Sequence, residues 1–223
     1  MIAREDTDAF MRTENLTAVL AANLEPVDAR RTTWRYALGM TASALAALIL
    51  TAGVLHVNPA LPHEVSEFAF WVRELYCASL GVLAVLCVAR LGRPGTRLGL
   101  LPTGIAVVVL IMWILAAISL FSAASQSRVH LLLGTTFAVC PFLIAFISAP
   151  LFFAFLWILK DLAPTRLRWA GAGAGFAAGA IGALVYTLHC PELTTPFIAT
   201  WYLLGMLIPT AIGAWLGPRL LRW

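Results

Sequence analysis

Charged residues are scarce in this sequence. They make up 12% of its 223 residues, whereas soluble domains carry about 25%. Hydrophobic residues reach 61%, and the mean hydropathy is +0.88. A chain this apolar is neither disordered nor an ordinary water-soluble enzyme or nucleic-acid-binding domain. The pI of about 9.2 would by itself suit a nucleic-acid partner, but in an apolar chain it more often reflects the placement of basic residues around a membrane.

Familiar catalytic motifs are also missing. The sequence has no Cys-x-x-Cys pair, no HExxH motif and no Walker lysine, so the usual signatures of a redox enzyme, a zinc protease and a P-loop are absent. The glycine-rich run at 171–177 resembles a dinucleotide fingerprint only superficially, because it lies inside an apolar helix with no preceding strand. The first residues are too polar for a cleavable signal peptide.

Six apolar runs are each long enough to cross a bilayer, which takes about 20 residues. They are Tyr36–Leu55, Ala69–Ala89, Leu98–Phe121, Phe137–Leu159, Trp169–Leu188 and Phe197–Leu216. The sequence therefore predicts an all-α integral membrane protein, with a six-helix transmembrane domain over residues 36–223 and a soluble, partner-binding tail over residues 1–35. No span has a central acidic or basic residue, which argues against a proton-coupled transporter.

Basic residues gather on one side of the predicted spans. Of the 15 lysines and arginines, only Arg73 and Arg128 fall on the other side. The positive-inside rule then places both termini in the cytoplasm. All four histidines lie on the opposite side, which is the periplasm in a bacterial inner membrane: His56, His63, His130 and His189.

The tail contains one short amphipathic pattern. Leu16, Val19, Leu20 and Leu24 share one face of a predicted helix, which Pro26 ends. An isolated helix of about 11 residues is marginal in water, so it needs a surface to pack on. Either it lies on the membrane or on the cytoplasmic loops, or it binds a partner and orders on contact.

The fifth span carries a ridge of small residues. Gly171, Gly175, Gly179 and Gly182 follow the small-xxx-small pattern that lets a neighbouring helix approach closely. We interpret the ridge as a packing surface, with a substrate pathway as the alternative.

One pair of ionisable residues lies within a predicted span. Arg73 and Glu74 are near the outer end of the second span, where charged side chains are functional candidates. At this depth both can reach the headgroups by snorkelling, and this is the interpretation we favour.

Two of the four cysteines are predicted at similar depth near the outer surface. Cys140 opens the fourth span and Cys190 follows the fifth, and the short connection 160–168 makes these spans antiparallel neighbours. Such a pair could form a disulfide if its Cα atoms lie about 4.4–6.8 Å apart. With imidazole nearby it could instead bind a soft metal.

Further residues near the spans are assigned smaller roles. His189, Glu192 and His130 are candidate supporting groups for a site at the cysteine pair. Cys77 and Cys87 are interpreted as small buried hydrophobes.

The C-terminal third carries a family resemblance. It reads His189-Cys190-Pro191-Glu192, then Phe197, Trp201-Tyr202-Leu203-Leu204-Gly205 and Gly217-Pro218-Arg219-Leu220-Leu221-Arg222-Trp223. Ala163-Pro164, Cys140 fifty residues before Cys190, and the runs 12–16 and 24–27 add to it. From about Met11 onward the chain resembles the negative regulator of sigma-F family of membrane-bound anti-sigma factors. The first ten residues, Cys77 and Cys87 have no counterpart in that pattern.

The resemblance implies a non-enzymatic regulator in the inner membrane of proteobacteria. The cytoplasmic tail would hold an extracytoplasmic-function sigma factor away from RNA polymerase, without direct nucleic-acid binding. Cys140 and Cys190 would sense heavy-metal or oxidative stress in the periplasm, with transient metal binding and no resident cofactor. The apolar face of the tail helix, through Leu16, Val19, Leu20 and Leu24, is the predicted sigma-factor contact.

Two other functions stay open at this stage. A membrane thiol oxidoreductase would use the outer cysteines but needs a second redox pair or a quinone site. A small metal or solute transporter would use the six spans and the outer histidines and cysteines.

Overall fold

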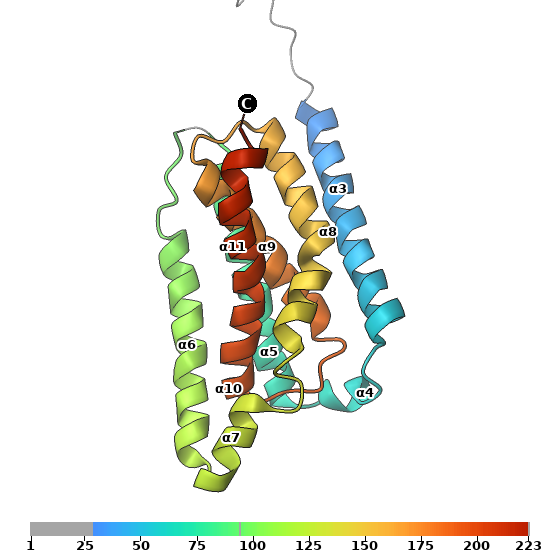
Figure 1. Ribbon diagram of the computed structural model, residues 1–223, viewed down its shortest axis with the longest axis vertical. Coiled ribbons are helices and arrows are strands. Elements are labelled where there is room, and N and C mark those ends of the chain that lie inside the picture. Colours follow the sequence, from blue (N-terminus) through green and yellow to red (C-terminus); the bar gives the residue numbers. More distant parts are fainter. Residues whose placement is uncertain (1–28, 94, 223) are drawn as a thin grey trace, which may run out of the picture. The chain divides into compact units, whose positions relative to one another are not determined.

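The computed structural model describes residues 29–93 and 95–222. The predicted tail helix, with Leu16, Val19, Leu20 and Leu24, lies outside the described residues. Within them the chain is helical and has no strand, which confirms the predicted all-α fold. The chain divides into two units, Met1–Ala37 and Leu38–Trp223, and the packing described below lies within the second (Figure 1).

Eleven helical elements build the described chain. They are α3 Ala29–Leu50, the π-helical turn η1 Thr51–Leu55, α4 Leu61–Glu64, α5 Phe68–Leu91, α6 Leu101–Ser122, α7 Ser125–Leu133, α8 Cys140–Asp161, α9 Leu167–Tyr186, α10 Thr195–Phe197, the π-helical turn η2 Ile198–Tyr202 and α11 Leu203–Leu220.

Six helices are long and apolar enough to cross a membrane, as predicted. They run over Thr33–Leu55, Phe68–Leu91, Leu101–Ser122, Cys140–Asp161, Leu167–Tyr186 and Thr195–Leu220, within four residues of the predicted limits. The third and fourth begin later than the apolar runs suggested. Pro102 and Pro141 occupy their first turns, where a missing N–H costs no intrahelical hydrogen bond.

The glycine ridge of α9 is a packing surface. A Cβ at Gly171 or Gly175 would collide with the backbone carbonyl of a residue in α11. A Cβ at Gly182 would lie 2.8 Å from the Cβ of Ser148 in α8. Helix α9 therefore packs backbone to backbone against its neighbours, and it contacts α11, α5 and α8 (Figure 1). Of the two readings of the ridge, the geometry supports close packing.

Helix α6 presents apolar side chains to the outside. Only Met112 and Ala116 are buried in it. The exposed large apolar side chains of this helix are Val107, Leu110, Ile111, Trp113, Ile114, Leu115, Ile118 and Phe121. A helix that is apolar on its outer face suits lipid and not water.

Three connections gather at one end of the second unit. They are residues 56–67 before α5, residues 123–139 before α8 and residues 187–194 before α10. Figure 1 shows α4, α7 and α10 at this end, opposite the C-terminus. It is called the cysteine end here, because Cys140 and Cys190 both lie in it.

Candidate functional site

The thiols of Cys140 and Cys190 meet at the cysteine end. Cys140 is the first residue of α8, where its N–H donates to the carbonyl of Thr136 at 2.9 Å. Cys190 follows α9, and its N–H donates to the carbonyl of Tyr186 at 3.1 Å. Both cysteines are free and fully buried, and they belong to one buried cluster in which their thiols are neighbours. The fold thus joins two residues for which the sequence predicted only a shared depth.

Two buried tyrosines lie beside the thiol pair. The rings of Tyr186 and Tyr202 lie 5.8 Å apart between centroids, and both residues are buried. The Tyr202 hydroxyl lies beside the Cys190 thiol without a well-aligned hydrogen bond. Cys77 is also fully buried and belongs to the same cluster of buried residues. Water and reagents therefore have no direct path to either sulfur.

The environment of Cys190 favours its thiolate. The neighbouring Cys140 thiol lowers the pKa of Cys190 below its ordinary value, and the Tyr202 hydroxyl, the Glu192 N–H and the Arg73 charge act in the same direction. Burial opposes these effects. Because a thiolate is the nucleophile and metal ligand of cysteine, Cys190 is the better prepared of the pair for either chemistry.

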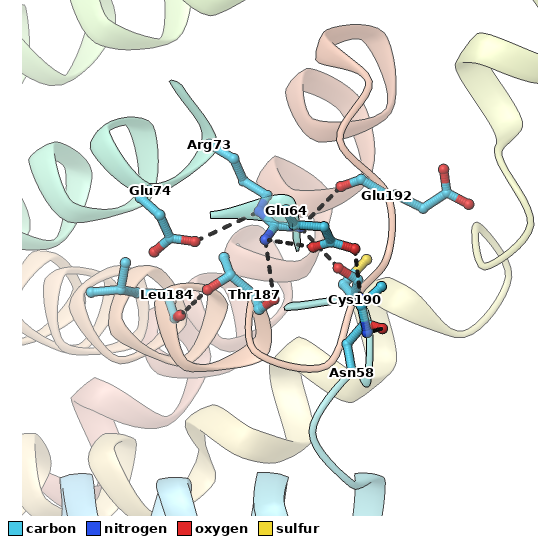
Figure 2. Close-up of polar contacts among 9 residues, drawn as sticks. Asn58, Glu64, Arg73, Glu74, Leu184, Thr187, Cys190 and Glu192 are labelled. Carbon is cyan, nitrogen blue, oxygen red and sulfur yellow. Dashed lines mark hydrogen bonds and ion pairs between the residues drawn. The ribbon is translucent and has the colours of Figure 1, made fainter. Parts of the chain in front are cut away.

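Arg73 lies inside the protein and not at the headgroups. Its side chain is 0% exposed, so the predicted snorkelling of Arg73 is wrong. Nη1 donates to the carbonyls of Cys190 at 2.8 Å and Glu192 at 3.1 Å, and Nη2 donates to the carbonyl of Thr187 at 3.2 Å (Figure 2). These three carbonyls follow the end of α9 and lie outside its helical hydrogen bonds, so they offer the guanidinium a polar site nearer than the membrane surface.

Two carboxylates balance the Arg73 charge. Glu64 Oε2 lies 3.9 Å from Nη2, and Glu74 Oε1 lies 3.6 Å from Nε (Figure 2). Glu74 therefore turns toward Arg73, although its side chain keeps 19% exposure. The Glu64 side chain is 8% exposed, and its other oxygen accepts from Asn58 Nδ2 at 2.6 Å. A buried charge is costly unless it is paired and hydrogen-bonded, and here it is both.

The connection 56–67 holds the Cys190 turn, residues 187–192, from a second side. The N–H of Asn58 donates to the carbonyl of Leu188 at 2.9 Å. Nδ1 of His189 lies 2.9 Å from the carbonyl oxygen of His56, which fixes the imidazole toward that connection.

The connection 123–139 holds the same turn from a third side. The carboxylate of Glu192 accepts from the Thr135 N–H at 2.7 Å and from its hydroxyl at 2.8 Å. Just beyond the turn, the Thr194 hydroxyl donates to the carbonyl of Leu131 at 3.0 Å. Arg73 and the two other connections of the cysteine end therefore all hold the turn that carries Cys190.

The predicted supporting residues lie near the pair, but their side chains have other partners. Those of His189 and Glu192 are engaged as just described, and His130 is exposed on α7. Among the described residues, no group of three or more His, Cys, Asp or Glu side chains is arranged to hold a metal ion. A metal bound here would depend on the two thiols, and the sensing role of the three residues stays a prediction.

Sequence reasoning missed Arg73 as the centre of this site. The signal was present, since an ionisable residue within a span is a functional candidate. Position along the helix could not distinguish a side chain that snorkels outward from one that turns toward the end of α9.

The fold and the site define a class of protein: a helical membrane protein that buries a free thiol pair where its connections meet. The chain belongs to the family described as negative regulator of sigma F, whose model matches residues 20–223. The probable anti-sigma-F factor NrsF of Azospira oryzae is 45% identical over 213 residues, which are 96% of this chain and the whole of that protein. The anti-sigma-F factor NrsF of Caulobacter vibrioides is 36% identical over 221 residues, with the same coverage. No solved structure matches the chain.

Proposed function

We propose that this protein is a membrane-bound anti-sigma factor with a sensor in the periplasm. Its cytoplasmic tail, residues 1–35, binds an extracytoplasmic-function sigma factor of the sigma-F type and keeps it at the inner membrane. Reaction of Cys140 and Cys190 with a heavy metal or an oxidant releases the sigma factor. Family membership and the names of both relatives support the sigma-factor partner.

The charge distribution supports the orientation that this function requires. In the predicted topology, 13 of the 15 lysines and arginines fall on the side of the tail and the C-terminus, which the positive-inside rule assigns to the cytoplasm. The cysteine end then faces the periplasm, an oxidising compartment in which a thiol pair meets oxidants and metal ions first.

The observation that carries the sensor proposal is the contact between the Cys140 and Cys190 thiols. An oxidant that accepts two electrons would convert the two thiols into a disulfide and release two protons. A soft metal cation would instead displace the two protons and bind both thiolates. Either product fixes a new sulfur geometry, with S–S about 2.05 Å in a disulfide, in a region packed too closely to absorb it freely.

The structure suggests how a change at the thiol pair would be transmitted to the rest of the bundle. Cys140 begins α8, and Cys190 follows α9, whose glycines pack on the backbone of α11. Closely packed interfaces shift between discrete arrangements and do not deform continuously. Reaction at the thiols would therefore move whole helices, and the positive-inside rule assigns their opposite ends to the cytoplasm, the compartment expected for the tail.

Sigma-factor binding can be tested apart from sensing. The tagged protein, solubilised from native membranes, should co-purify a sigma factor only when residues 1–35 are present. A Leu20→Asp variant should lose it, because a charge on the apolar face of the predicted helix opposes burial. Retained binding by both the truncated and the substituted protein would move the binding site to the cytoplasmic loops.

The sensor is tested by replacing both Cys140 and Cys190 with serine. The variant should insert in the membrane and hold the sigma factor, yet fail to release it under cadmium or oxidant stress. The matched control is Cys87→Ser, which changes a cysteine at the other end of α5 and should leave the response unchanged. Normal induction in the double variant would refute the sensor assignment.

A further inference from the structure

The turn that carries Cys190 covers the thiol pair. Both sulfurs belong to fully buried residues, so a reagent reaches them only when some part of the protein opens. Residues 187–192 belong to the shortest of the three connections, 187–194, and carry one of the thiols themselves. Their displacement would therefore expose Cys190 without moving a whole helix.

Arg73 makes more of the contacts that hold this turn than any other residue. Its guanidinium bonds three carbonyls, those of Thr187, Cys190 and Glu192. These bonds are charge-assisted, and such bonds are about twice as strong as neutral ones. The fork geometry of the guanidinium lets one side chain reach several carbonyls at once, which a lysine ammonium on a flexible stem reproduces poorly.

Apart from the backbone bond between Asn58 and Leu188, the remaining contacts of the turn are less sheltered. The bonds of His189 to His56 and of Glu192 to Thr135 lie at the exposed surface, where water competes with them. Figure 2 shows the guanidinium at the centre of the network, with Glu74 on one side and Glu64, Cys190 and Glu192 on the other.

We propose that Arg73 is the positioning residue of the thiol pair: by fixing residues 187–192, it holds Cys190 against Cys140 and keeps both thiols closed to reagents until the turn leaves it. Such a residue would set the threshold of the sensor. The inference concerns the thiol pair of the proposed function, but its test requires neither a sigma factor nor stress.

The test is the rate at which N-ethylmaleimide alkylates each cysteine of the full-length protein in lipid nanodiscs, read by peptide mass spectrometry. In Arg73→Met, Cys190 should react at least about tenfold faster than in the wild type, which corresponds to about 1.4 kcal/mol less for opening the turn. Cys140, which lies on α8 and not on the turn, should respond less. Cys87, at the far end of α5, should keep its rate and so report that the bundle remains folded.

Two further variants complete the design. Arg128→Met removes an exposed arginine of the same end whose only bond described is to the carbonyl of Ala123, and it should leave Cys190 unchanged. Arg73→Lys keeps the charge without the fork, and it should give a rate between those of the wild type and Arg73→Met. If Cys87 of the Arg73→Met protein is also alkylated faster, the bundle of that variant has unfolded. The Cys190 rate of Arg73→Lys then decides whether the proposal holds.

The proposal is overturned if Arg73→Met leaves the Cys190 rate unchanged, or if Arg73→Lys reacts at the wild-type rate. Either result leaves the sensor proposal standing. In turn, normal stress induction in the double cysteine variant would refute the sensor without touching the role of Arg73 in closing the turn.

Discussion

Replacing Glu64 with glutamine tests how far the buried charge network stabilises the protein. Two unit charges 3.9 Å apart attract by about 4 kcal/mol at an effective dielectric constant of 20. The cost of burying the carboxylate offsets part of this attraction. Glutamine keeps an oxygen for Asn58 but presents no charge to Arg73, so the free energy of unfolding should fall by about 2 kcal/mol, in the range of one charge-assisted hydrogen bond.

The assay is equilibrium unfolding in detergent micelles, followed with a fluorogenic maleimide that reacts as the buried cysteines become accessible. Glu67→Gln is the matched control, because it makes the same change on an exposed residue of the same connection and should stay within about 0.5 kcal/mol of the wild type. If the Glu64 and Glu67 variants are equally stable, Glu64 does not balance Arg73 and the description of the network is wrong.

Two further predictions concern packing and pH. Gly175→Val should destabilise the bundle by at least about 1–3 kcal/mol, since its Cβ would collide with the carbonyl of Pro209, whereas Gly53→Val meets open space and should be tolerated; equal unfolding midpoints in the micelle assay would contradict the close contact of α9 and α11. The pKa of Cys190 is lower in the closed turn than in the open one. Ionisation of its thiol therefore stabilises the closed turn above the ordinary thiol pKa of about 8.5, and this stabilisation is lost as pH falls through the lowered pKa. The alkylation rate of Cys190 should therefore be nearly flat from about pH 8.5 down to neutrality and fall at lower pH, while a tenfold drop per pH unit starting near 8.5 would show an ordinary thiol.

The spans could be predicted because the bilayer imposes a length and a composition on each of them. Runs such as Leu98–Phe121 contain no charged residue, so their assignment as spans is unambiguous. The predicted starts of α6 and α8 were three residues too early, because the helices begin only at the turn that contains Pro102 or Pro141. The packing role of the glycine ridge could also be predicted, since four glycines on one face of a helix have few uses other than the close approach of a neighbouring helix. Because of these constraints, the architecture of a membrane protein can be predicted from a single sequence.

The sequence predicted that Cys140 and Cys190 lie at similar depth, but it could not predict that their thiols are neighbours. Hydropathy places Cys140 and Cys190 near the same surface, and the short connection between their helices makes these helices neighbours. Whether two side chains at equal depth touch depends on how each helix is rotated about its axis, and a mean hydropathy carries no such information. The supporting residues show the same limit, because His189 and Glu192 lie beside Cys190 in the chain yet direct their side chains to His56 and Thr135.

The error over Arg73 has a physical cause that applies beyond this protein. Snorkelling assumes that the nearest water or headgroup is the best partner for a charge near the end of a span. A neighbouring helix that ends at the same depth offers an alternative, since the carbonyls just beyond its end lie outside the helical hydrogen bonds and near the negative end of its dipole. Helix α9 ends at Tyr186, level with Arg73, and the turn after it points three carbonyls at the guanidinium. An arginine one or two turns inside a span should therefore be weighed against every helix C-terminus at its own depth, and a cysteine just beyond such a terminus marks the turn that the arginine would hold.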